Sequence, residues 1–227
     1  MPLRYKCLIL DHDDTAVDSS ATIHYPAHLE AMRLLRPGCR PVDLQGWFLK
    51  NFDPGIMEYL SGELGMSPPE LRWEYRIWSR FGARRIPSFF PGFLEALRSY
   101  RESGGRVAVV SHSEKRAIAR HYRHTPRPQR FFPDLILGWH RDERKRKPSP
   151  WPVLQVLNAF KLEARQALIV DDLKPGVLMA RSAGVPAAAS GWCHRIPRIE
   201  AYMRRNCLAY LETVEEFARF ILTPEEA

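Results

Sequence analysis

Residues 6–19 read KCLILDHDDTAVDS, a short apolar run followed directly by a group of acidic residues. A short apolar run bounded by polar residues is typical of a strand buried in a parallel sheet. Similar runs recur later in the chain, and amphipathic helical stretches separate most of them. This alternation predicts an α/β fold with a parallel sheet and helices on both of its faces. The predicted strands are residues 6–10, 106–110, 134–137, 167–170 and 185–188.

A long interval separates the first predicted strand from the second. Residues 11–105 lie between them, whereas a simple crossover needs only about a dozen residues. The interval contains several helix-like pieces and no stretch of comparable strand character. We therefore predict an inserted α-helical subdomain of residues 18–87 within a core of residues 1–17 and 88–227. The aromatic residues of the insert form its own small core or line a pocket facing the core domain: Trp47, Phe48, Phe52, Trp73, Trp78 and Phe81.

The composition of the 227-residue chain is that of a globular protein, with 45% hydrophobic and 26% charged residues. No apolar run approaches the roughly 20 residues of a membrane helix, and the N-terminus does not resemble a secretory signal. The four cysteines form no CxxC pair, which favours a reducing cytoplasm. The formal charge of +8 leaves a nucleic-acid partner open. Because the basic residues are spread along the chain, we treat nucleic-acid binding as the less favoured alternative.

Polar side chains follow several predicted strands at the point where each strand ends. In an open parallel sheet, ligands bind beyond these carboxyl ends. Clustered carboxylates repel one another unless a cation compensates them, and Mg²⁺ prefers such oxygen ligands. The sequence therefore predicts a magnesium site, against the alternative that these acids only cap the helices that follow. The acidic residues assigned to this site are Asp11, Asp13, Asp171 and Asp172.

A hydroxyl and an ammonium group complete an anion site at the same edge. Ser111 follows the second predicted strand, and Lys147 precedes a predicted helix. A hydroxyl donates to a phosphate oxygen, a helix N-terminus adds free N–H groups, and a lysine neutralises charge on a transferring phosphoryl group. These residue types predict phosphate binding.

Four motifs, in this order and spacing, resemble those of the haloacid dehalogenase-like superfamily of phosphotransferases. DHDDT at residues 11–15 is similar to its DxDxT motif, and VAVVSHS at residues 107–113 resembles its second motif. RKPSP at residues 146–150 is similar to its lysine motif, and VDDLKPGVLMARSAG at residues 170–184 to its acidic fourth motif. The resemblance covers residues 6–191 and implies a Rossmann-like core. The insert resembles the helical C1 cap of the branch that includes phosphoglycolate phosphatases and β-phosphoglucomutases.

The resemblance also implies residue roles. Asp11 would be the nucleophile that forms an aspartyl-phosphate, and Asp13 the general acid and base. Mg²⁺ would be held by the Asp11 carboxylate, the Asp13 backbone carbonyl and Asp172, with Asp171 assisting. The phosphate-binding residues would be Ser111, Lys147, the His112 backbone amide, and Thr15, which orients Asp13 or tightens the loop.

Four positions depart from the family pattern. Ala16 stands where a leucine is usual. Asp14 stands where a glycine is usual, and we interpret it as a turn residue that points away, with added negative charge near the site as the alternative. His12 is interpreted as a spacer, with a contact to the leaving group as the alternative. Gly176 stands where many members carry another acid, a variant that resembles the sugar-phosphate mutase-like subgroup.

Together these features predict a Mg²⁺-dependent cytoplasmic phosphatase of a small phosphorylated metabolite, acting as a monomer or homodimer. The alternatives are a sugar phosphomutase of the β-phosphoglucomutase type, a non-catalytic binding protein with this fold, and a nucleic-acid-binding protein.

Overall fold

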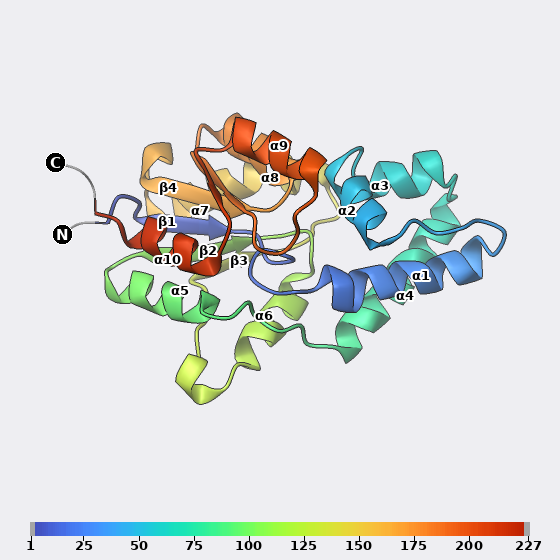
Figure 1. Ribbon diagram of the computed structural model, residues 1–227, viewed down its shortest axis with the longest axis horizontal. Coiled ribbons are helices and arrows are strands. Elements are labelled where there is room, and N and C mark those ends of the chain that lie inside the picture. Colours follow the sequence, from blue (N-terminus) through green and yellow to red (C-terminus); the bar gives the residue numbers. More distant parts are fainter. Residues whose placement is uncertain (1–2, 225–227) are drawn as a thin grey trace. The chain divides into compact units, whose positions relative to one another are not determined.

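Six parallel strands form one sheet in the computed structural model, which describes residues 3–224 (Figure 1). The strand order is β3-β2-β1-β4-β5-β6, so β1 lies between β2 and β4. The prediction of an α/β fold with a parallel sheet is confirmed, and β6 is a strand that the sequence did not predict. The strands are β1 (Cys7–Leu10), β2 (Arg106–Val110), β3 (Leu135–Leu137), β4 (Ala167–Asp171), β5 (Ala187–Ser190) and β6 (Ala209–Leu211).

The central strands are apolar throughout because both faces of the sheet are covered. All four residues of β1 are buried. Leu8 and Leu10 belong to one hydrophobic cluster, whereas Cys7 and Ile9 belong to the cluster on the opposite face. This arrangement follows from the alternation of side chains along a strand.

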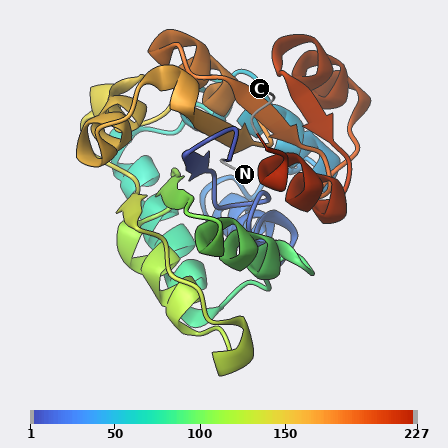
Figure 2. The ribbon, with the colours of Figure 1, turned by 90° about the vertical axis from the view of Figure 1, so that its left-hand side faces the viewer.

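Two helical layers cover the sheet (Figure 2). On one face lie α5 (Phe93–Glu102), α6 (Lys115–Arg123) and α10 (Val214–Leu222), which share a hydrophobic cluster with the strands. On the other face lie α7 (Trp151–Phe160) and α8 (Lys174–Ala183). The remaining helix of this part, α9 (Pro197–Asn206), packs against α8. Helices on both faces agree with the prediction.

The chain divides into two units, which we call the core unit and the helical unit. The core unit comprises the segment up to Val17 and the segment from Phe89 onward, and the helical unit is Asp18–Ser88. Ser88, which the sequence placed in the core, falls in the helical unit, where its carbonyl accepts the Asp18 amide at 3.0 Å.

The helical unit has its own hydrophobic core, formed by Met32, Trp47, Tyr59, Leu60 and Met66. Trp47 therefore packs as an aromatic core residue, whereas Trp73 is 55% exposed. A capping box of Ser67 and Glu70, followed by proline, starts the longest helix of this unit. The helices are α1 (Tyr25–Leu35), α2 (Leu44–Phe52), α3 (Ile56–Glu58) and α4 (Pro68–Arg84), with π-helical turns at Ser20–His24 and Tyr59–Glu63.

The two segments of the core unit pair beside the insertion point. Val17 forms an antiparallel bridge with Phe89, and the amide of Phe90 donates to the Ala16 carbonyl at 3.1 Å. The loop that follows β1 is therefore held within the core unit.

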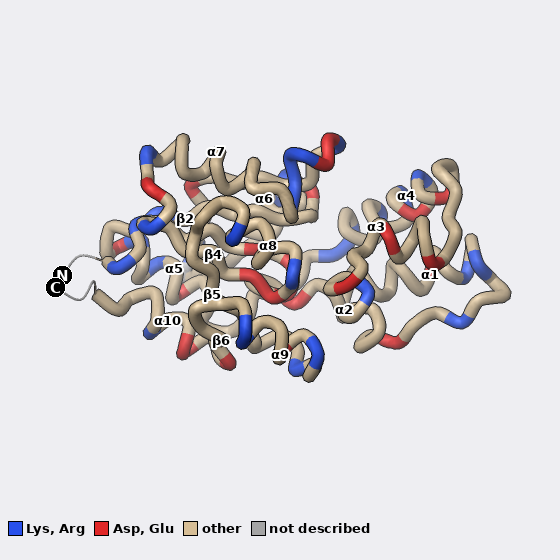
Figure 3. The backbone as a smooth tube through the Cα atoms, turned by 90° about the horizontal axis from the view of Figure 1, so that it is seen from above, with Lys and Arg blue, Asp and Glu red and all other residues tan. Residues whose placement is uncertain are grey.

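Lys and Arg residues are distributed over helices of both units (Figure 3). This distribution agrees with the spread of basic residues along the sequence. Among residues 3–224, no helix combines the length and the apolar character needed to cross a bilayer.

Candidate active site

The acidic residues after β1 and β4 meet at one edge of the sheet. Leu10 is in register with Val170 on the neighbouring strand, and the Asp11 amide donates to the Val170 carbonyl at 2.9 Å. Each of Asp11, Asp171 and Asp172 offers a carboxylate oxygen, and these atoms lie within 4.8 Å of one another. All three side chains are buried. The structure thus brings together the three carboxylates that the sequence assigned to a metal site.

Lys147 reaches into this acidic group. Its Nζ lies 2.5 Å from Oδ1 of Asp11 and 2.7 Å from Oδ2 of Asp171, and its side chain is only 6% exposed. Burial alone would lower the pKa of the ammonium, but the adjacent carboxylates outweigh burial and raise the pKa above its ordinary value. Lys147 therefore stays charged beside Asp11.

The carboxylates carry more negative charge than Lys147 balances. Burial raises the pKa of Asp11 well above its ordinary value; Lys147 opposes this rise, whereas Asp171, Asp172 and Asp13 add to it. Burial likewise raises the pKa of Asp172, and the neighbouring charge of Asp171 adds to the effect. The site therefore favours a further positive charge.

A divalent cation fits these residues. The donors are buried carboxylate oxygens, which are the hard ligands that Mg²⁺ takes, and they are close enough to share one ion. A bound cation would favour the charged forms of Asp11 and Asp172, which burial and the neighbouring carboxylates disfavour.

Asp171 is fixed by contacts on both carboxylate oxygens. Oδ1 accepts the amide of Leu173 at 3.0 Å, and Oδ2 accepts from Lys147. A Cβ atom at Gly176 would overlap the Asp171 carboxylate. Gly176 therefore leaves the space in which Asp171 stands, which gives a steric reason for glycine at this family-variant position.

Ser111 and Asp13 lie together at the same edge. The Ser111 hydroxyl donates to Oδ2 of Asp13 at 3.1 Å and accepts the amide of Ser113 at 3.0 Å. The His112 ring lies beside the chain at Lys147, with Nε2 donating to the Lys147 carbonyl at 3.0 Å. Burial, aided by the Lys147 charge, lowers the pKa of His112 to about 4, so this ring is neutral near pH 7.

Thr15 contacts residues at and just beyond the end of β5. Its Oγ1 lies 2.8 Å from the Ser190 hydroxyl at the end of β5, and its carbonyl accepts the indole N–H of Trp192 at 3.0 Å. The side chain is fully buried. These contacts tie the loop after β1 to β5, and a direct role of Thr15 in phosphate binding stays a prediction.

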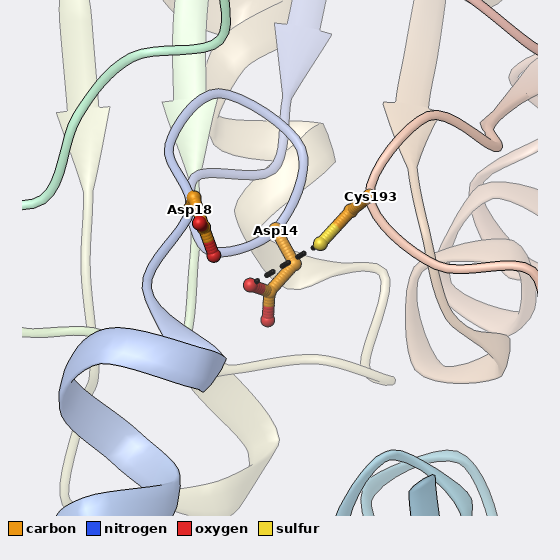
Figure 4. A group of neighbouring side chains, drawn as sticks. All are labelled: Asp14, Asp18 and Cys193. Carbon is orange, nitrogen blue, oxygen red and sulfur yellow. Dashed lines mark hydrogen bonds between the residues drawn. The ribbon is translucent and has the colours of Figure 1, made fainter. Parts of the chain in front are cut away.

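Asp14 adopts a left-handed backbone conformation with φ of 61°, which explains why glycine is usual at this position. Its amide donates to the Val17 carbonyl at 2.7 Å, so the predicted turn is present. The side chain is buried, and the Cys193 thiol donates to its Oδ1 at 3.6 Å. Figure 4 shows the Cys193 side chain pointing toward Asp14.

His12 is also fully buried. Its Nε2 lies 2.9 Å from Nδ1 of His121 on α6, and the two rings stack at 5.2 Å. This packing favours the interpretation of His12 as a spacer.

His194 is a site neighbour that sequence reasoning missed. Its Nε2 lies 3.2 Å from Oδ2 of Asp172, and its side chain is 7% exposed. Burial lowers the pKa of His194, so the ring favours the neutral form. The available signal was the Trp-Cys-His run directly after the last predicted strand, where an α/β sheet places ligand-binding residues.

A family model described as haloacid dehalogenase-like hydrolase matches residues 56–190. PpaX of Caldanaerobacter subterraneus subsp. tengcongensis, assigned as a pyrophosphatase, is 37% identical over 126 residues, which span 53% of this chain and 56% of that protein. The chain thus spans little more than half the length of this relative. A phosphoglycolate phosphatase of Nitrosospira multiformis is 23% identical over 188 residues, 81% of this chain and 82% of that one.

Solved structures show the same fold at low identity. A haloacid dehalogenase-like hydrolase from Streptococcus pneumoniae has a TM-score of 0.76 at 18% identity, covering 96% of this chain and 98% of that one. CbbY from Rhodobacter sphaeroides, solved in complex with phosphate, has a TM-score of 0.71 at 18% identity, covering 94% and 96%.

Proposed function

The chain belongs to the haloacid dehalogenase-like hydrolase family, and we propose that it is a Mg²⁺-dependent phosphatase of a small phosphorylated metabolite. The observation that carries this proposal is the buried Asp11 carboxylate, which is paired with Lys147 and lies beside Asp171 and Asp172. A buried carboxylate can attack an anionic phosphate ester only if nearby positive charge compensates its own negative charge. In this proposal Lys147 and a cation bound by the three carboxylates compensate it. Relatives named as phosphoglycolate phosphatases support the same reaction class.

In the first step, a carboxylate oxygen of Asp11 attacks the phosphorus atom of the ester. The bond between phosphorus and the ester oxygen breaks, and Asp13 donates its proton to the departing oxygen, which leaves as an alcohol. The phosphoryl group is then carried by Asp11. Lys147 neutralises charge on the transferring oxygens, as its position beside Asp11 supports.

In the second step, Asp13 removes a proton from water, and the water oxygen attacks phosphorus. The bond between phosphorus and the Asp11 oxygen breaks, which releases inorganic phosphate and restores the Asp11 carboxylate. The Ser111 hydroxyl, which donates to Asp13, orients that residue or holds a phosphate oxygen in this proposal. The His112 backbone amide likewise holds a phosphate oxygen.

Asp11, Asp172 and the Asp13 carbonyl would hold Mg²⁺, with Asp171 assisting, and the ion would supply electrostatic screening between the anionic nucleophile and the anionic substrate. In this proposal the helical unit, Asp18–Ser88, acts as the cap that selects the substrate.

The test compares Asp11→Asn with the wild type and with Asp142→Asn, whose carboxylate pairs with Arg144 outside the site. Phosphate release is measured from p-nitrophenyl phosphate, phosphoglycolate, pyrophosphate and a hexose 1-phosphate, with Mg²⁺ and with a chelator. We expect the wild type and Asp142→Asn to be active with Mg²⁺ and inactive with the chelator. Asp11→Asn is expected to lose at least about a thousandfold in rate, since it removes the nucleophile.

Retained turnover in Asp11→Asn would contradict the proposed nucleophile. Conversion of the hexose 1-phosphate to its isomer without phosphate release would identify a phosphomutase instead. Wild-type activity that persists with the chelator would contradict metal dependence.

A further inference from the structure

Residues 192–194 follow β5 closely, and each of their side chains contacts a different part of the candidate site. The Trp192 indole donates to the Thr15 carbonyl. The Cys193 thiol donates to the Asp14 carboxylate (Figure 4). The His194 imidazole lies within hydrogen-bonding distance of Asp172. Three consecutive side chains therefore reach both the turn that follows the proposed nucleophile and a proposed metal ligand.

We propose that residues 192–194 form a positioning loop, which fixes the turn after Asp11 and the direction of the Asp172 carboxylate and thereby sets the affinity for the metal. The part of this proposal that concerns metal affinity rests on the proposed function. His194 is the positioning residue for Asp172, because its N–H donates to one carboxylate oxygen and limits rotation of the group. Partners of this kind orient metal ligands and typically change metal affinity about 10- to 100-fold when removed.

Contacts at β5 and β6 fix the position of the chain that leads into the positioning loop. The Gly191 amide donates to the Leu211 carbonyl of β6 at 2.8 Å. A Cβ atom at Gly191 would overlap the Tyr210 ring, so the chain passes closely over β6. The Ser190 hydroxyl adds a further contact to Thr15 at 2.8 Å. β5 and β6 therefore fix the backbone from which the three side chains of the loop extend.

The indole of Trp192 is also anchored by packing. Its ring lies 6.2 Å from that of Phe93 and 5.6 Å from that of Phe217. A phenylalanine at this position keeps one aromatic ring in that cluster, but it removes both the N–H that donates to Thr15 and part of the packed indole. Phe217→Leu, which reduces ring packing in the same cluster and removes no hydrogen bond, is therefore the matched packing control.

The experiment measures Mn²⁺ binding, from the electron paramagnetic resonance of the free ion, in His194→Ala, His194→Gln and wild type. A glutamine amide can place an N–H near the position of the histidine Nε2, so it is the rescuing variant. His124→Ala, at the exposed end of α6, is the control. We expect His194→Ala to weaken Mn²⁺ binding at least about tenfold, His194→Gln to restore most of it, and His124→Ala to match wild type.

Amide hydrogen exchange in peptides that contain residues 13–17 gives a second measurement, independent of metal and turnover. We expect Trp192→Phe to speed exchange there severalfold, and Phe217→Leu to leave exchange there close to that of wild type although it also lowers Tm. Unchanged exchange in Trp192→Phe, or unchanged Mn²⁺ affinity in His194→Ala, would overturn the positioning role. A wild type that hydrolyses no phosphate ester would overturn the proposed function, whereas the exchange result would still decide the role of the loop.

Discussion

At the scale of single residues, the site depends on how buried charges are compensated. The carboxylates of Asp11, Asp171 and Asp172 share the ammonium of Lys147. Removing one partner of a buried ion pair typically costs about 3–5 kcal/mol, because a buried charge is left without compensation. Lys147 is therefore needed to keep the acidic group folded as well as to neutralise the phosphoryl group.

Gly176 offers a test of this arrangement that removes no charged group. In Gly176→Ala, the added Cβ would overlap the Asp171 carboxylate and displace it from Lys147. We expect phosphatase activity to fall at least about tenfold, and stability to fall by about 1–3 kcal/mol, as for other overpacked sites. The measurements are the initial rate with Mg²⁺ and the free energy of unfolding in urea.

The matched control is Gly82→Ala in α4, where nothing lies within 4 Å of the added Cβ. Alanine is a better helix former than glycine, so this variant should be more stable by up to about 1 kcal/mol and fully active. Wild-type activity in Gly176→Ala would show that the position of Asp171 does not matter.

The motif residues of the site were predictable, because parallel strands that end in polar residues bring them to one edge of the sheet. Asp11, Asp171, Asp172 and Lys147 lie together as the sequence indicated. The contact of His194 with Asp172 was not predicted, since it depends on the path of the chain between β5 and β6 and no acidic motif marks it.

At the scale of elements, the apolar runs located five of the six strands to within two residues. The run at β2 gave the observed bounds, Arg106–Val110. β5 begins at Ala187 rather than at residue 185, because Pro186 has no amide to donate to a ladder. β6 was missed because it has only three residues and only Leu211 is buried, so it carries no periodic pattern.

His28 on α1 makes the stability of the helical unit depend on pH. Its ring is buried against Trp47 and Tyr59, and neither ring nitrogen has a hydrogen-bond partner among the described residues. Burial lowers its pKa from 6.5 to about 4. The unfolded chain therefore binds a proton at His28 at a higher pH than the folded chain does. The resulting stability is complete above about pH 6.5 and is lost as the pH falls toward 4.

Replacing His28 with phenylalanine should remove this dependence while keeping an aromatic ring in the core. Relative to wild type, His28→Phe should gain up to about 3 kcal/mol of unfolding free energy between pH 6.5 and 4. Urea unfolding at several pH values measures this gain, with the exposed His124→Phe as control. Parallel pH profiles for His28→Phe and wild type would show that His28 does not couple packing to protonation.

At the scale of the whole molecule, the insertion divides the core sequence without dividing the site. Asp11 and Asp13 precede the helical unit in the sequence, whereas Ser111, Lys147 and Asp172 follow it, and all of them belong to the core unit. The order of the motifs predicted this fold and family from the sequence. The aromatic residues of the insert were harder to assign, because a helical pattern alone does not distinguish core from exposed positions, as Trp47 and Trp73 show.

Covalent transfer of the phosphoryl group to Asp11 is the central step of the proposed reaction, and chemical trapping of the phosphoryl-enzyme reveals that step. Wild-type protein is quenched during turnover of a phosphate ester with Mg²⁺ and treated with borohydride, which reduces an acyl phosphate on aspartate to homoserine. Peptide mass spectrometry then locates the reduced residue, with Asp11→Asn as the blank. We predict homoserine at position 11 in the wild type only. Reduction at another residue, or none under conditions of sustained turnover, would contradict the account.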